Sequence, residues 1–226
     1  MNDTTLEQRA KIGPVRDKLL KAYGVPTWHP DLDPVSQLVS TILSQNTNDV
    51  NRDVAYEQLR ARLPTWEKVR DAQVEEVIEA IRPAGLANQK GPRIQAALRF
   101  VTAERGELDL DFLADWPVEQ AKDWLSSIKG VGPKTAAIVL LFSLGRPAFP
   151  VDTHIHRVTR RLGLIGPQVS REKAHRELES LVPPEDYFSF HLNVIRHGRE
   201  VCISRKPRCP ACVLRELCDF YRSLKP

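Results

Sequence analysis

The fold is decided by Leu125–Arg157, LSSIKGVGPKTAAIVLLFSLGRPAFPVDTHIHR. Apolar residues three or four positions apart predict two helices with one apolar face each. These positions are Trp124, Leu125 and Ile128 in the first helix, and Ala136, Val139 and Leu140 in the second. Gly130-Val131-Gly132 separates the helices, because glycine adopts backbone angles that other residues avoid. Pro133 suits the first helical position, where its missing N–H would have no intrahelical partner. The stretch therefore predicts a glycine hairpin between two helices, the second starting at Pro133.

The start of this second helix is a candidate site for chemistry. Helix N-termini present unpaired amides and a partial positive charge, and glycines let a phosphate approach them. Lys134 lies in the first helical turn, and Asp152 follows 18 residues later at the head of the next helix. An amine and a carboxylate at two successive helix starts form a candidate catalytic pair. The alternatives are a tight turn without a ligand and, for Asp152, a simple helix cap.

The run Leu-Ser-Ser-Ile-Lys-Gly-Val-Gly-Pro-Lys-Thr-Ala, followed by Val151-Asp152-Thr153-His154, resembles the helix-hairpin-helix DNA glycosylase superfamily, specifically its endonuclease III branch. The resemblance extends from about Asp33 to Cys218 and implies two helical lobes with an active-site cleft between them. It places residues 31–146 in one lobe, and residues 1–30 with 147–226 in the other. It also implies that Lys134 is the nucleophile and that Asp152 assists it, as in bifunctional enzymes that combine glycosylase and abasic-site lyase activity.

Further site residues follow from the same resemblance. Asn46 matches the polar residue that fills the hole left by a flipped nucleotide, and the neighbouring Gln45 is the alternative. Leu86 matches a leucine that wedges into the duplex, although a leucine in a polar turn often packs inward. The hairpin Gly130–Gly132 is expected to hold a phosphate, and His154 is a further candidate DNA contact whose alternative is a packing role.

The four cysteines form the most specific motif of the chain. Cys202, Cys209, Cys212 and Cys218 follow the spacing C-x6-C-x2-C-x5-C. Nothing at the N-terminus indicates export, so clustered thiols favour a metal over disulfides. Zinc is the first alternative, but structural zinc sites more often use two short knuckles, and only one is present. Four thiolates within seventeen residues suit a [4Fe–4S] cluster, and the spacing matches the cluster site of endonuclease III.

Positive charge accumulates near the cysteines. The chain has 33 basic and 29 acidic residues, a net charge of +4, whereas Arg196–Pro226 alone carries eight basic and three acidic residues. Arg205, Lys206 and Arg208 lie between the first two cysteines, in a loop that a metal would hold at both ends. This loop is expected to dock on DNA phosphates, with a solvated surface as the alternative. The cluster is accordingly expected to have a structural and DNA-docking role.

The remaining sequence predicts an all-α fold. Helical periodicity continues from Asp33-Pro34 onward, strand-like alternation is never sustained, and Pro14 is expected to bend the first helix or delay its start. Of the 226 residues, 42% are hydrophobic and 27% charged, and no run approaches the ~20 apolar residues of a membrane span. The protein is therefore expected to be cytoplasmic and to reach the nucleoid through DNA.

Taken with the resemblance, these patterns predict a base-excision repair enzyme. It is expected to remove oxidised or damaged pyrimidines from duplex DNA through a lysine Schiff base and β-elimination. The expected partner is double-stranded DNA with a damaged base or an abasic site, bound by a monomer without a membrane. The alternatives are a monofunctional, mismatch-type glycosylase and a non-catalytic DNA-binding module.

Overall fold

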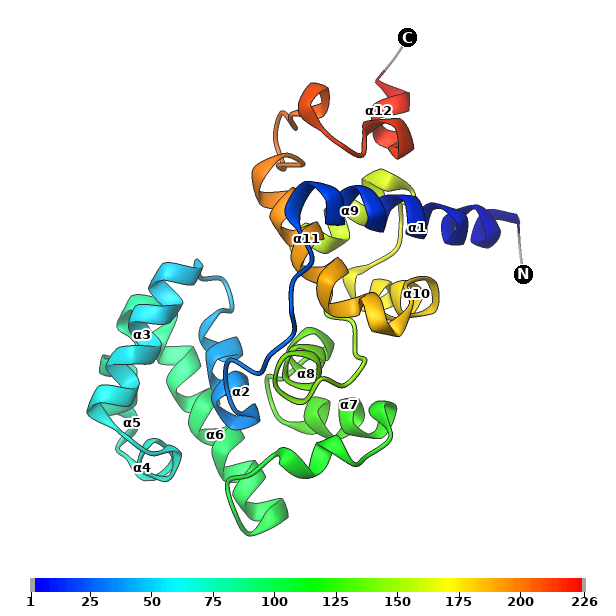
Figure 1. Ribbon diagram of the computed structural model, residues 1–226. Coiled ribbons are helices and arrows are strands. Elements are labelled where there is room, and N and C mark those ends of the chain that lie inside the picture. The colour runs from blue at the N-terminus through cyan, green and yellow to red at the C-terminus, as the bar shows by residue number, and fades with distance from the viewer. Residues whose placement is uncertain (1–2, 225–226) are drawn as a thin grey trace. The chain divides into compact units, whose positions relative to one another are not determined.

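The structure is a computed structural model that describes residues 3–224, and within this range it contains helices and no β-strand (Figure 1). The predicted all-α class is confirmed. The chain divides into two compact units, one of residues His29–Arg146 and one that joins the segment up to Trp28 to the segment from Pro147 onward. The first boundary thus falls after residue 28, where the sequence placed it after residue 30. No helix in the described range is both long and apolar enough to cross a membrane.

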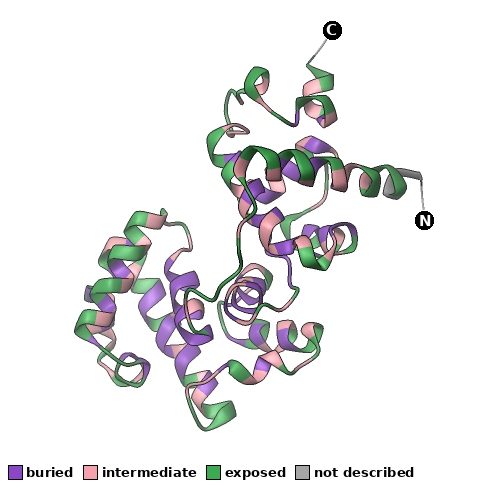
Figure 2. Ribbon diagram, in the orientation of Figure 1, coloured by how far each residue is buried: buried purple, intermediate pink, exposed green. Residues whose placement is uncertain are grey.

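The unit His29–Arg146 is built around a nearly fully buried helix, α2. Asp33 caps this helix by accepting a hydrogen bond from the Ser36 amide at 2.9 Å, and Pro34 occupies its first position, as predicted. The helices of the unit are α2 (Pro34–Leu43), α3 (Asp49–Arg62), α4 (Trp66–Asp71), α5 (Val74–Ala80), η1 (Arg82–Ala84), α6 (Ala87–Arg105), η2 (Asp111–Ala114), α7 (Val118–Ser127), α8 (Pro133–Ile138) and η3 (Val139–Ser143). Figure 2 shows the buried faces of α2, α6 and α8 that form this core.

The two hairpin helices are α7 and α8, and α8 begins at Pro133 as predicted. After Ile138 the helix widens into the π-helical segment η3, a change that the periodicity of the sequence does not reveal. Its Val139, Leu140 and Leu141 side chains are buried, so the wider turn lies within the core. The packing of α2 against both α8 and η3 therefore fixes the hairpin on the core of its unit.

The second unit contains α1 (Asp3–Tyr23), α9 (Thr153–Leu162), α10 (Arg171–Leu181), η4 (Pro184–Asp186), α11 (Tyr187–Glu200), η5 (Cys209–Ala211), η6 (Arg215–Leu217) and α12 (Asp219–Ser223). Of the two effects expected of Pro14, a bend or a delayed start, the delayed start is wrong, because α1 starts at Asp3 and continues through Pro14. Burial of Ile12, Val15 and Leu19 on either side compensates for the backbone hydrogen bond that proline cannot make. Helix α11 packs against both α1 and α9 and so forms the centre of this unit.

Candidate functional site

The glycine hairpin is tightly packed at its first glycine. Gly130 has φ +88°, and a Cβ there would lie only 2.5 Å from the side chain of Arg93. The next residue, Val131, is buried, and its amide donates to the Ile128 carbonyl at 2.9 Å. A Cβ on Gly132 would meet no atom within 4 Å. Gly130 is thus favoured by its own backbone angle, and a Cβ there would also displace the Arg93 side chain, whereas Gly132 leaves open space at the start of α8.

Lys134 is the second residue of α8 and is half-buried. The three residues after it, Thr135, Ala136 and Ala137, are buried in the core of the unit. The lysine is therefore held on a rigid helical turn directly after the hairpin. A primary amine on a rigid element next to an open backbone is an arrangement suited to a nucleophile.

In the loop between α2 and α3, Gln45 and Asn46 have different surroundings. The Gln45 side chain accepts a hydrogen bond from Arg93 Nη1 at 2.5 Å and donates to the Gly130 carbonyl at 3.4 Å. Asn46 is exposed and has a left-handed backbone with φ 54°. The structure thus ties Gln45 to the hairpin and presents Asn46 to solvent.

Leu86 is an exposed apolar residue in a strained conformation. Its side chain is 48% exposed, so the inward-packed alternative is wrong. Its φ of 50° is left-handed, which is a genuine outlier for a bulky residue, and it directly precedes α6. Leu86 also borders an open hollow lined by Ile78, Arg82, Ala87, Asn88 and Gln89.

Asp152 caps α9. This is the simpler of its two expected roles, the other being assistance to Lys134. Its Oδ1 accepts a hydrogen bond from the Ile155 amide at 2.7 Å, and the side chain remains half-buried. Lys134 belongs to the unit His29–Arg146 and Asp152 to the other unit.

His154, the second residue of α9, has a packing role. Arg157 Nη2 donates to its Nδ1 at 3.1 Å, and its ring lies close to Gly198, where a Cβ would come within 3.1 Å of the His154 side chain. Burial lowers the pKa of His154, and so disfavours a charged imidazole at neutral pH. Contact with DNA stays a prediction for this residue.

The four cysteines surround one cavity. Cys202, Cys209, Cys212 and Cys218 all line one small, partly open pocket, together with Arg161 and Phe220. Arg161 Nη1 donates to Cys202 Sγ at 3.3 Å, and Cys218 Sγ donates to the Arg161 carbonyl at 3.2 Å. Within residues 3–224, no set of three or more His, Cys, Asp or Glu side chains is grouped so that it could hold a metal ion. The four cysteines thus line one pocket, but their side chains are not grouped as in a formed metal site.

Burial governs the protonation of these thiols. It raises the pKa of Cys212 to about 11 and also raises that of Cys218. Both thiols are accordingly protonated at neutral pH, and a metal ion bound there would have to displace their protons. In kind and number the donors suit an iron–sulfur cluster, because four cysteines from one chain segment line the same pocket.

The basic loop after Cys202 is fixed at its base and open at its tip. Arg161 donates to the Ile203 carbonyl at 2.8 Å and to the Ser204 carbonyl at 2.9 Å. Arg205, Lys206 and Arg208 are exposed, and Lys206 has a left-handed φ of 52°. Their charges are thus available at a surface whose backbone is held by α9.

Two functional candidates were missed by the sequence. Arg93 and Lys90, on one face of α6, reach the Gln45 side chain and the Leu43 carbonyl, respectively. The only sequence signal is a basic residue spaced among the apolar positions of a helix, which is too common to identify a site. Leu43 and Gln45 lie more than 40 positions from these residues, so the two contacts exist only in the folded chain.

Comparison with known proteins agrees with this geometry. A family model described as HhH-GPD superfamily base excision DNA repair protein matches residues 39–184. Endonuclease III of Sulfolobus acidocaldarius is 35% identical over 186 residues, which cover 81% of each chain. Endonuclease III of Thermotoga maritima is 32% identical over 197 residues, covering 87% of this chain and 88% of the relative.

Solved structures extend the comparison to the backbone. A non-covalent endonuclease III–DNA complex superimposes with a TM-score of 0.82 at 27% identity, covering 96% of this chain and 97% of the other. The resemblance stated from the hairpin and the cysteine spacing is thereby confirmed. The chain belongs to the HhH-GPD superfamily of base excision DNA repair proteins.

Proposed function

We propose that the protein is a base-excision repair DNA glycosylase with abasic-site lyase activity. The observation that carries the proposal is Lys134, an amine on the first turn of α8 directly after the glycine hairpin. The similarity to endonuclease III over more than four fifths of the chain supports the same activity. Lysine supplies a nucleophile that a module serving only to hold DNA would not need.

Lys134 attacks C1′ of the damaged nucleotide and displaces the base, which leaves with a proton. The C1′–O4′ bond then breaks as O4′ takes up the proton held by Asp152, and the resulting iminium links the enzyme to the opened sugar. Loss of a C2′ proton then breaks the C–O bond on the 3′ side, and hydrolysis of the imine regenerates the lysine. Asp152 takes the proton that the lysine loses and balances the positive charge that develops on the sugar.

A base in duplex DNA must leave the stack before this chemistry can begin. We propose that Leu86 enters the stack, and that Asn46 rather than Gln45 fills the vacated position. The exposure of Leu86 and Asn46 supports this assignment, as do the hydrogen bonds that hold Gln45 at Arg93 and Gly130. Unstacking costs a few kcal/mol, which contacts to the phosphates offset.

Truncation of the wedge separates this role from core packing. Leu86→Ala is expected to lower base release from damaged duplex clearly while changing the free energy of unfolding little, because a 48% exposed side chain buries little area. Leu98→Ala, a fully buried position of α6, is the matched control and should cost about 2–5 kcal/mol. Chemical denaturation and single-turnover assays provide the two measurements. A stability loss at Leu86 as large as that at Leu98 would assign Leu86 to the core.

The proposed substrates are oxidised or ring-saturated pyrimidines in duplex DNA. A panel of otherwise identical duplexes, each with one lesion or one mismatch, tests both the activity and the substrate class. Base release coupled to strand cleavage, strongest for a damaged pyrimidine, is the expected result. Release without cleavage would support a mismatch-type enzyme, and the absence of both would contradict the proposal. Sedimentation velocity with and without duplex checks the proposed monomer.

We further propose that Cys202, Cys209, Cys212 and Cys218 hold a [4Fe–4S] cluster in the cavity that they share. When bound, the cluster cross-links the chain segment that carries the basic loop. The protein purified anaerobically should be brown and contain about four irons per chain. Cys212→Ser should lower the yield of folded protein, because metal binding and local folding are coupled. A colourless, stable protein that contains zinc alone would contradict the assignment.

The basic loop is proposed to contact DNA phosphates. Replacing Arg205 and Lys206 by glutamine should weaken binding to all DNA sequences and flatten the plot of log affinity against log salt by up to ~1 per lost contact. Arg171 and Lys173, at the start of α10, lie outside this loop and provide a matched control pair. Fluorescence anisotropy at several salt concentrations measures the slopes. Equal slopes for the loop variant and the wild type would show that the loop faces solvent in the complex.

A further inference from the structure

Two exposed turns of the unit His29–Arg146 carry non-glycine residues in the left-handed region. Asn46 has φ 54° and Leu86 has φ 50°. This region is disfavoured for residues with a Cβ, more so for leucine than for asparagine. Such conformations persist only where the surrounding structure holds them. The source of that support is one buried side chain.

Lys90 lies beneath both turns and is 1% exposed. Its Nζ donates to the Leu43 carbonyl at 2.7 Å, to Thr47 Oγ1 at 2.7 Å and to the Ala84 carbonyl at 2.8 Å. Leu43 and Thr47 flank Asn46 in the chain, and Ala84 precedes Leu86 by two residues. Lys90 thus fixes one turn on both sides of Asn46 and joins it to the other.

Further hydrogen bonds complete the connection. The backbone amide of Lys90 donates to the Leu86 carbonyl at 3.0 Å, and the Thr47 hydroxyl donates to the Ala84 carbonyl. One residue of α6 therefore holds the Leu86 turn through its main chain and through its side chain.

The ammonium group is suited to this task. It carries three N–H donors, and all three are matched by acceptors at 2.7–2.8 Å. Burial lowers the pKa of Lys90 to about 8, so the group remains largely protonated at neutral pH. An apolar side chain of similar length would avoid burying a charge, but it would leave two backbone carbonyls without this donor. Stability of the core alone does not explain a lysine here.

We infer that Lys90 is a positioning residue that holds Asn46 and Leu86 as one preformed unit for insertion into DNA. The inference rests on the proposed function, because it assigns the two turns to a damaged duplex. Lys90 itself touches no DNA and acts through the two exposed residues. Its loss therefore slows the opening of the base stack rather than the chemistry at the sugar.

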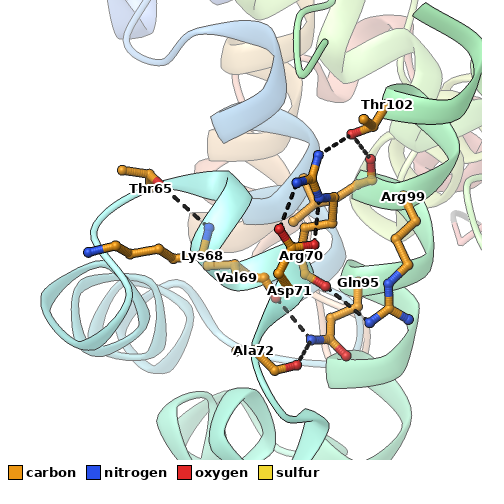
Figure 3. A network of polar contacts seen from close by, with 10 residues as sticks. Thr65, Lys68, Val69, Arg70, Asp71, Ala72, Gln95, Arg99 and Thr102 are labelled. Atoms are coloured by element: carbon orange, nitrogen blue, oxygen red, sulfur yellow. Dashed lines mark hydrogen bonds and ion pairs between the residues drawn. The ribbon is translucent and has the colours of Figure 1, made fainter. Parts of the chain in front are cut away.

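Gln95 provides a matched control on the same helix. It is 2% exposed, and its Nε2 donates to the Val69 carbonyl at 2.9 Å and to the Ala72 carbonyl at 2.8 Å (Figure 3). Gln95→Met thus removes a buried donor from two backbone carbonyls, as Lys90→Met does, but at the end of α4 and not at the insertion turns. Both variants therefore share any general effect of removing a buried hydrogen-bond donor.

The experiment compares Lys90→Met, Gln95→Met and the wild type at equal concentrations of folded protein. A lesion duplex with 2-aminopurine beside the lesion reports unstacking by its fluorescence, and single-turnover assays report base release. Cleavage at a preformed abasic site in single-stranded DNA, which requires no unstacking, reports the chemistry. Lys90→Met is expected to slow unstacking and base release by roughly 100-fold, the scale of a misplacement of about 1 Å. Single-strand cleavage should remain near the rate of Gln95→Met.

A second variant and a second readout keep the test decisive if Lys90→Met folds poorly. Thr47→Val keeps the shape of the side chain but removes the hydroxyl between Lys90 and Ala84, and it should slow the same step. Amide hydrogen exchange should accelerate around Asn46 and Leu86 in both variants, and around Val69 and Ala72 in Gln95→Met. Equal unstacking by Lys90→Met, Thr47→Val and Gln95→Met would overturn the inference. A wild type without activity on any lesion duplex would overturn the proposed function instead.

Discussion

Lys134→Gln is expected to reduce borohydride-trapped adducts with abasic DNA to background while leaving DNA affinity nearly unchanged. Borohydride reduces the imine between a lysine and the opened sugar to a stable amine, and an amide cannot form that imine. The hairpin backbone, the exposed loop and the turn with Leu86 all remain in the variant. Gel analysis after reduction detects the adduct, and anisotropy measures the affinity.

Lys129→Gln is the matched control for this prediction. Lys129 is exposed and directly precedes Gly130, so its replacement removes the same charge from the same hairpin. This control should trap like the wild type. Persistent trapping by Lys134→Gln would move the nucleophile to another amine, whereas loss of trapping in both variants would indicate an effect of charge on binding.

Much of this site could be predicted from local rules. The left-handed Gly130, the helix start at Pro133 and the cap by Asp152 each depend on a few neighbouring residues, and all three occur in the structure, whereas Gly132 has an ordinary extended backbone. The cysteine spacing and the family resemblance predict the chemistry from the sequence, and the roles of these residues stay predictions. Local rules suffice where a feature is set within one turn of the chain.

The features that the sequence did not predict are contacts between segments that lie far apart in the chain. Lys90 reaches Leu43 across 47 positions, and Arg93 reaches Gln45 across 48, so no local pattern marks either residue. The left-handed conformation of Leu86 was also unpredictable, because leucine disfavours it intrinsically. Where a residue has a conformation that it disfavours locally, as Leu86 does, long-range hydrogen bonds stabilise that conformation. Such positions are where function is most often found.

Asp152→Asn is expected to slow base release by roughly 10²–10⁴-fold, the range typical of a lost acid–base group, without destabilising α9. Asparagine caps helices about as well as aspartate, so the hydrogen bond from the Ile155 amide at 2.7 Å should persist. The neutral amide can neither accept the lysine proton nor balance the cation that develops on the sugar. Single-turnover kinetics and thermal denaturation measure the two effects separately.

Asp33→Asn is the matched control, which tests whether slow base release by Asp152→Asn comes from an altered helix cap or from the lost charge of Asp152. Asp33 caps α2 through the Ser36 amide at 2.9 Å, so the control repeats the change of chemistry at a second helix start in the other unit. Its activity should stay near that of the wild type. If Asp152→Asn were equally active, the carboxylate would be a cap alone, and the proton of Lys134 would have to go to another acceptor. If Asp152→Asn lost stability together with activity, the slow rate would reflect a displaced α9, because asparagine then fails to restore the cap at this position.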